Sequence, residues 1–252
     1  MKIQYCSDLH LEFPDNRTWL DQNPLVPKAD LLIIAGDTYH LGRDFDKHPY
    51  FDVLSHAFEQ VFLIPGNHEY YSGYNVENSE GEMDIALRHN VHLVNNKELV
   101  IEDTHLIFTT LWSRIQKEPW EVLRGLLDFQ RIQFRGKLLS LDTYNYLHDH
   151  ALLFLKNALK NKETKKQVVI THHLPSHFCN VEEFRNSPLN EGFCVDLTSL
   201  IEASSADVWI YGHSHRNVPK FEINGTRMLT NQLGYVGLEE HQTFNREAWV
   251  QV

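Results

Sequence analysis

Potential metal ligands follow five short apolar runs of this 252-residue chain. They are Asp8 and His10 in DLH, Asp37 in GDT, Asn67 and His68 in GNHE, His172 and His173 in THH, and His213 and His215 in GHSH. Carboxylate, amide and imidazole donors without a thiolate suit Mn, Fe or Zn and disfavour a structural Cys-type zinc site. One ion needs fewer donors than this, so two divalent ions that share a bridging carboxylate are the simpler interpretation.

The local spacing supports a common site. Asp8 and His10 are two residues apart, as are His213 and His215, and this is the period at which side chains of an extended chain share a face. Gly residues stand just before the donors of the second, third and fifth motifs, where the backbone can turn sharply and approach its neighbours closely.

The apolar runs themselves predict buried strands at 2–6, 30–36, 61–66, 167–171 and 207–212. Apolar residues at helical spacing predict helices at 50–60 and 141–160, with Asp142 as a candidate N-cap of the second. Alternating strands and helices indicate an α/β fold. If the five strands lie side by side, their carboxyl ends bring the polar residues to one edge of a sheet, where such folds bind ligands.

A second group of strands follows a different pattern. The runs 91–94, 98–102 and 105–112 are separated by short polar turns, and Asn224-Gly225 predicts a two-residue hairpin turn within 221–230. We therefore expect a second sheet, mostly of hairpins, packed on the first. Residues 72–90 and 176–194 are expected to be surface loops. No repeat or linker interrupts the sequence, which favours a single domain over residues 1–252.

The bulk composition restricts the partners. A formal net charge of −11 disfavours an extended nucleic-acid-binding surface, because Lys and Arg are the residues that bind phosphate backbones. The same charge allows a small phosphorylated substrate that is held by metal ions. Three Cys is an odd and low number, as expected in a reducing, cytoplasmic compartment. We find no signal peptide or membrane span in the sequence. The sequence does not predict the oligomeric state.

The five motifs together resemble the calcineurin-like metallophosphoesterase superfamily, whose pattern is D-x-H, G-D, G-N-H-(D/E), H and G-H-x-H. The resemblance extends over residues 8–215 and implies a two-sheet β-sandwich flanked by helices, an αββα four-layer fold, with a two-metal centre that hydrolyses phosphate esters. It implies one ion held by Asp8, His10, Asp37 and His215. The other ion would be held by Asp37, Asn67, His172 and His213, with Asp37 as the bridge.

The same resemblance implies that a hydroxide shared by the two ions attacks phosphorus in line with the leaving oxygen. His68 is then the catalytic residue that stays off the ions, stabilises the developing charge or protonates the leaving group. Glu69 is expected either to orient its neighbours or to be an ordinary salt-bridged carboxylate. His173 either touches substrate or packs beside His172.

Residues 111–137 mix Arg and aromatic side chains and have two interpretations. They form either a lid whose Arg residues, Arg131 among them, clamp phosphate, or an amphipathic helix and loop packed on the core. The pieces LWSR and LDFQRI resemble one bacterial-type branch of the superfamily but identify no substrate. Three functions follow: a phosphatase or phosphodiesterase acting on small esters, including nucleotides; a nuclease; and a non-catalytic metal-binding scaffold.

Overall fold

The structure is a computed structural model that describes residues 1–42, 44–161 and 164–252. Its strands are β1 (Lys2–Cys6), β2 (Leu31–Ile34), β3 (Gln60–Leu63), β4 (Met83–Arg88), β5 (Val91–Asn95), β6 (Lys97–Ile101), β7 (Thr104–Phe108), β8 (Gln133–Phe134), β9 (Lys137–Leu138), β10 (Lys166–Ile170), β11 (Val208–Tyr211), β12 (Phe221–Ile223), β13 (Thr226–Thr230) and β14 (Trp249–Gln251). Its helices are α1 (Pro14–Gln22), α2 (Tyr50–Ala57), α3 (Pro119–Gly125), α4 (Asp128–Arg131), α5 (Leu141–Ala158), α6 (Glu182–Arg185) and α7 (Thr198–Ala203).

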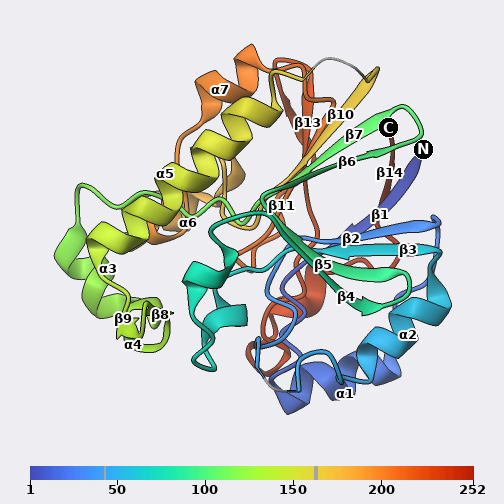
Figure 1. Cartoon of the computed structure of the whole chain (residues 1–252), viewed down its shortest axis with the longest axis horizontal. Coiled ribbons are helices and arrows are strands. Elements are labelled where there is room, and N and C mark those ends of the chain that lie inside the picture. The colour runs from blue at the N-terminus through green and yellow to red at the C-terminus, as the bar shows by residue number, and fades with distance from the viewer. Residues whose placement is uncertain (43, 162–163) are drawn as a thin grey trace.

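Two six-stranded sheets pack face to face, with helices on both outer faces (Figure 1). The first sheet has the order β14-β1-β2-β3-β5-β4, and the second has the order β12-β13-β11-β10-β7-β6. In each sheet four central strands are parallel and both edge strands are antiparallel. Helices α1 and α2 cover the first sheet, and α5 and α7 cover the second. The expected α/β sandwich of four layers is therefore confirmed.

The central strands are apolar on both faces because each face packs against another layer. On β2, Leu31 and Ile33 belong to the core between the sheets, whereas Leu32 and Ile34 belong to the core under the first sheet's helices. All four side chains are at most 4% exposed. Burying such a side chain contributes roughly 1.5–3 kcal/mol. This double burial explains the uninterrupted apolar runs of the sequence.

The five ligand-bearing strands do not lie side by side, and that expectation is wrong. β1, β2 and β3 are neighbours in the first sheet, but β10 and β11 lie in the second. Parallel pairing with β7 and β13 fixes β10 and β11 there. A run buried on both faces has the same composition in either sheet, so composition alone did not distinguish them. The ligands meet because the carboxyl ends of both groups of parallel strands lie at the same end of the sandwich.

The second sheet is also not mostly hairpins. The run 91–94 forms β5, which pairs parallel with β3 in the first sheet. The β6–β7 and β12–β13 hairpins exist, but parallel β10 and β11 lie between them. The predicted hairpin turn is confirmed: Asn224 and Gly225 both have positive φ, at 45° and 89°.

Two local expectations need correction. The segment 72–90, expected to be a loop, contains the edge strand β4, which buries Met83 and Leu87 and exposes the residues between them. The N-cap of α5 is Ser140 rather than Asp142, because the Ser140 hydroxyl accepts the Thr143 N–H at 3.2 Å in a capping box. Asp142 lies in the first turn, where its charge favours the helix dipole.

Residues 111–137 form α3, α4 and the small β8–β9 hairpin, outside the two main sheets. Arg124, Arg131 and Arg135 of this segment are exposed, as expected of an amphipathic segment packed on the core. The segment 176–194 contains short helical turns, including α6 and a 3₁₀ turn at Asn190–Gly192. Within the described residues we find no helix with the length and apolar character needed to cross a membrane.

Candidate metal centre

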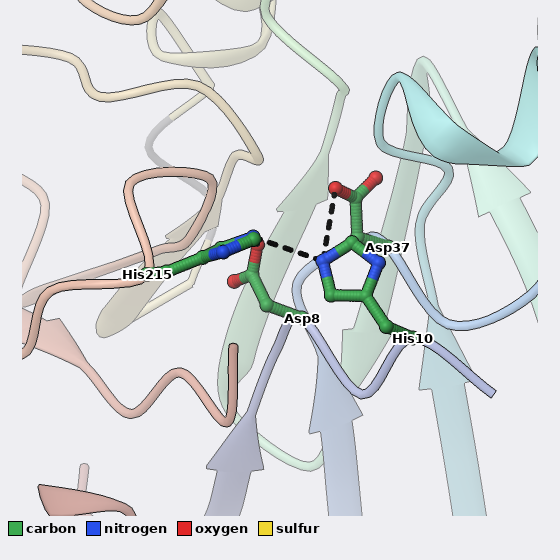
Figure 2. A group of neighbouring side chains, drawn as sticks. All are labelled: Asp8, His10, Asp37 and His215. Atoms are coloured by element: carbon green, nitrogen blue, oxygen red, sulfur yellow. Dashed lines mark hydrogen bonds and ion pairs between the residues drawn. The ribbon is translucent and has the colours of Figure 1, made fainter. Parts of the chain in front are cut away.

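Asp8, His10, Asp37 and His215 gather at the carboxyl ends of the strands (Figure 2). One donor atom from each of them lies within 4.8 Å of the donors of the others. The Nε2 atom of His10 is 2.9 Å from that of His215 and 3.7 Å from Oδ2 of Asp37. Nε2 of His215 is 3.4 Å from Oδ1 of Asp8. Donor atoms about 2.0–2.2 Å from a shared ion lie this far apart.

A second group lies on the other side of Asp37. Asp37, His172 and His213 also place donor atoms within 4.8 Å of one another. Nε2 of His172 is 3.4 Å from Oδ1 of Asp37, 3.1 Å from Nδ1 of His213 and 3.3 Å from Oδ1 of Asn67. Asp37 therefore turns one carboxylate oxygen toward each group.

Hydrogen bonds on the far side of three of the imidazoles fix which nitrogen faces the site. Nδ1 of His10 lies 2.9 Å from Oε1 of Glu12, and Nδ1 of His215 lies 2.8 Å from Oε2 of Glu240. Nδ1 of His172 lies 2.8 Å from the carbonyl of Ala35. Each of these acceptors favours a proton on Nδ1, so Nε2 faces the cluster and, in the neutral ring, presents its lone pair there. Such outer partners are typical of metal-bound histidines, so the residues present fit a metal site.

The amide of Asn67 is oriented in the same way. Its Nδ2 donates to Oδ1 of Asp128 at 2.9 Å and lies 3.1 Å from the Tyr71 hydroxyl. The Tyr71 hydroxyl in turn donates to the same Asp128 oxygen at 2.5 Å. These bonds turn Oδ1 of Asn67, the atom that binds metals, toward His172.

Two glycines allow this close packing. A Cβ atom on Gly36 would overlap the His172 ring, and one on Gly66 would overlap both Asp37 and His172. Any larger residue at either position would displace the side chains of the cluster. The glycines that directly precede Asp37 and Asn67 are therefore explained by contact with the donors of other motifs.

The backbone of the cluster is strained. Five of the gathered residues have positive φ, which costs about 1–2 kcal/mol for most side chains and less for Asp and His. They are Asp8 at 56°, His10 at 48°, Asp37 at 54°, His213 at 81° and His215 at 53°. Backbone strain of this kind clusters at functional sites, where the surrounding fold imposes it.

Negatively charged carboxylates and positively charged imidazoles contact one another in this cluster, where both are buried from solvent. Burial raises the pKa of the Asp37 carboxyl, but the charges of His172 and His68 outweigh burial and hold that pKa well below its usual value. Burial lowers the pKa of His172, yet the Asp37 charge prevails and raises it to about 9. Bonds to Asp8 and Glu240 likewise overcome burial and raise the pKa of His215 to about 10. The carboxylates thus keep protons on the imidazole nitrogens, and a divalent cation that binds here would displace those protons.

Glu12 is a site residue that the sequence reasoning missed. Its Oε1 atom lies 2.9 Å from Nδ1 of both His10 and His68. Burial raises the pKa of Glu12, but these two bonds outweigh burial and lower it to about 2. The signal was present, because Glu12 continues the two-residue spacing of Asp8 and His10. Asp128 was also missed, and no spacing in the sequence connects it with Asn67.

His68 lies beside the cluster rather than within either ligand group. Its backbone N–H donates to Oδ1 of Asp37 at 3.0 Å, and its Nε2 lies 3.2 Å from the Tyr235 hydroxyl. Burial lowers the pKa of His68, but the charges of Asp37 and Glu12 outweigh burial and raise it. The ring therefore holds a proton between Glu12 and the cavity beside the cluster.

Glu69 orients the loops that carry the donors. It is fully buried and accepts backbone N–H groups from Asp37 at 3.1 Å, Thr38 at 2.6 Å and Gly66 at 2.7 Å. Burial is the largest effect on Glu69, and it raises the pKa of this carboxyl. Of the two interpretations of Glu69, the contacts favour the one in which it orients its neighbours.

The two candidate substrate contacts lie in different places. His173 is fully buried behind His213, with ring centroids 4.1 Å apart, and it is not among the residues that line the cavity. This position favours packing over contact with substrate. Arg131 is exposed, and its guanidinium lies 5.8 Å from the Tyr71 ring, which does line the cavity.

A cavity of about 370 Å³ opens beside the cluster. Asp37, Asn67, His68, His213 and His215 line it on one side. Residues from 125–128 and 180–193 also line it. The segment 111–137 thus contributes to the cavity as well as packing on the core. A small phosphorylated molecule placed here would contact both ligand groups and His68.

Comparisons with known proteins agree with this geometry. Residues 1–217 match the model of the family described as calcineurin-like phosphoesterase. An uncharacterized protein, L509, of Acanthamoeba polyphaga mimivirus is 30% identical over an alignment of 281 residues, which covers 99% of this chain and 96% of that protein. The crystal structure of phosphopantetheinyl hydrolase (PptH) from Mycobacterium tuberculosis has the same fold, with a TM-score of 0.75, 15% identity and coverage of 99% and 95%. The chain belongs to the calcineurin-like phosphoesterase family and is a hydrolase that acts on phosphoester bonds.

Proposed function

We propose that this protein, as a single domain over residues 1–252, is a two-metal phosphoesterase of small phosphorylated substrates. The position of Asp37 is the observation on which this rests. Its Oδ2 faces His10 at 3.7 Å and its Oδ1 faces His172 at 3.4 Å, so one carboxylate joins two sets of donors. The first set is Asp8, His10, Asp37 and His215, and the second is Asp37, Asn67, His172 and His213.

The donor chemistry supports Mn, Fe or Zn. Two such ions, when bound, would neutralise charge on the phosphoryl oxygens and make water a better nucleophile at neutral pH. The three cysteines are free and buried, which supports neither thiolate ligation nor a cysteine nucleophile. Reduced thiols also support our expectation of a cytoplasmic compartment.

His68 is the proposed catalytic residue. Glu12 holds its Nδ1, so Nε2 is the nitrogen available to the cavity. From there the ring can donate a hydrogen bond to a phosphoryl oxygen or give its proton to the leaving oxygen. General-acid catalysis of this kind contributes typically about 10²–10⁴ in rate. Arg131 remains a proposed substrate contact, since an exposed guanidinium beside the Tyr71 ring can reach a phosphate at the cavity mouth.

Small esters fit this site better than nucleic acid does. The net charge is −11, and a cavity of about 370 Å³ has room for a small molecule. A nuclease requires a wider basic surface. A non-catalytic scaffold would not require His68 to be held by Glu12.

The experiment is hydrolysis of p-nitrophenyl phosphate and bis-p-nitrophenyl phosphate by protein loaded with Mn, Fe, Zn or Mg. We expect metal-dependent release of p-nitrophenol, and the ratio of the two rates separates a phosphatase from a phosphodiesterase. Protein that binds metal but cleaves neither compound would favour the scaffold. Cleavage of oligonucleotides faster than of both small esters would favour the nuclease.

A further inference from the structure

Part of the cavity lining beside the ligands is apolar. Leu126, Leu127, Phe184, Leu189 and Phe193, here called the apolar wall, all line the cavity. They come from two segments that are distant in the sequence, 125–128 and 184–193. Small-molecule sites commonly combine such a surface with a few polar groups that fix orientation.

The two segments interlock through two leucine–glycine contacts. A Cβ atom on Gly125 would lie 2.5 Å from Leu189, and a Cβ on Gly192 would overlap Leu126. Each segment therefore places a leucine over a glycine of the other. Because both contacts are already close, the wall has a defined position in the absence of substrate.

The ring of Phe193 continues the wall up to the ligand groups. It packs on His213, with ring centroids 4.7 Å apart. Any molecule whose phosphate meets the second ligand group therefore has an apolar surface directly beside it.

The same cavity offers little to a second anion. Among its described lining residues, Arg216 is the single Lys or Arg. Its guanidinium lies 2.9 Å from Oε1 of Glu240 and 3.4 Å from Oε1 of Glu183, and 5.3 Å from the Phe184 ring. Two carboxylates already share this positive charge, and Asp128 adds a further acidic group to the lining. A negatively charged substrate group placed inside the cavity, away from the exposed Arg131 at its mouth, would meet carboxylates rather than cations.

We propose that the apolar wall binds an uncharged alkyl or aryl group of the substrate, so the enzyme selects phosphoesters of apolar alcohols. Substrates with a second anionic group, polyphosphates included, are selected against. This inference rests on the proposed function, because the phosphate of the substrate must sit at the two ligand groups.

The test measures binding of phosphonates, which place one variable group beside one phosphate mimic. Methylphosphonate, n-butylphosphonate and 3-carboxypropylphosphonate are titrated calorimetrically into metal-loaded protein and compared as inhibitors of p-nitrophenyl ester hydrolysis. Each buried methylene strengthens binding roughly four-fold. We therefore expect butylphosphonate to bind at least about 10-fold more tightly than methylphosphonate. The carboxypropyl compound should bind no more tightly than the methyl compound.

Variants locate the effect on the wall. Leu127→Ala and Leu189→Ala should reduce the butyl-to-methyl ratio by roughly three-fold or more while methylphosphonate binds as before. Leu127 is 47% exposed, so its truncation should not impair folding even if that of Leu189 does. Leu153→Ala, on the exposed face of α5, is the matched control and should leave the ratio unchanged.

The outcomes separate this inference from the proposed function. Equal binding of the three phosphonates, tightest binding of the carboxypropyl compound, or a ratio unaffected by both wall variants would overturn the inference. Absence of ester hydrolysis would count against the proposed function, and the calorimetric series would still decide whether the wall selects apolar groups.

Discussion

The Nε2 atoms of His10 and His215 lie 2.9 Å apart, while the Nδ1 atom of each ring lies within 3 Å of a glutamate oxygen. When both rings are neutral with Nδ1 protonated, their Nε2 lone pairs point at one another, and a cation between them would replace the proton that otherwise joins the two nitrogens. The two imidazoles, each oriented by a glutamate, are therefore preorganised to bind an ion. The first predictions follow from this arrangement.

Removal of metal should destabilise the fold as well as stop hydrolysis. A ligand present at 100 times its Kd stabilises a protein by about 2.7 kcal/mol. For a chain of this length we expect chelation to lower Tm by about 5–10 °C. Differential scanning fluorimetry with EDTA, followed by re-addition of Mn or Zn, measures this. An unchanged Tm, in protein shown to have lost its metal, would contradict a site inside the folded core.

Asp37→Asn should lower the metal content of the protein by more than any substitution in one ligand group. The amide removes the charge that both groups share, so we expect metal content to fall from about two ions per chain to fewer than one. His172→Ala, which affects the second group alone, is the comparison and should retain about one ion. Elemental analysis of both purified variants decides. Full metal occupancy and activity in Asp37→Asn would rule out the bridge.

His68→Ala should keep its metal and lose turnover. The side chain belongs to neither ligand group, so metal content should match that of the wild type, while kcat falls by about 10²–10⁴. Steady-state kinetics and elemental analysis on the same sample are needed. Should kcat stay within a factor of about three of wild type, the ring has no part in proton transfer or charge stabilisation.

Glu12→Gln should lower activity by about 10–100-fold, the usual effect of removing an outer partner of a metal-bound histidine. One carboxylate oxygen holds both His10 and His68, and the amide can replace it only in part. We expect kcat to fall with KM little changed, and Glu12→Asp to fail to restore it because the shorter chain cannot reach both rings. Glu247→Gln, at an exposed ion pair with Lys28, is the matched control. Wild-type kinetics in Glu12→Gln would show that this contact is incidental.

The structure brings the predicted donors together, and the signal that identified them in the sequence is local. A polar residue within two positions of the end of a buried run marks the end of a strand, and Asp8, Asp37 and His213 are all of this kind. The two-residue spacing of Asp8 and His10 also leads to Glu12, although left-handed backbone at Asp8 and His10, rather than an extended chain, brings these side chains together.

The assignment of strands to sheets and the other contacts of the site depend on segments that are distant in the sequence. Whether β10 joins the first or the second sheet depends on its pairing with β7 and β11, which no local pattern specifies. The bond between Asp128 and Asn67 joins residues 61 positions apart in the sequence. The apolar wall was hidden for the same reason, since Leu126 and Leu189 have ordinary local surroundings and acquire a role only when their segments interlock.

The left-handed backbone of the ligand loops lowers the stability of the fold at the same residues that the proposed catalysis requires. Replacing Asp8 or His215 with glycine would relax the main chain, because glycine adopts positive φ without steric penalty. A laboratory selection for heat resistance alone, in medium depleted of transition metals, should therefore accumulate glycine or asparagine at these very positions. The most heat-stable variants from such a selection would be those that had lost metal ligands and, with them, hydrolysis.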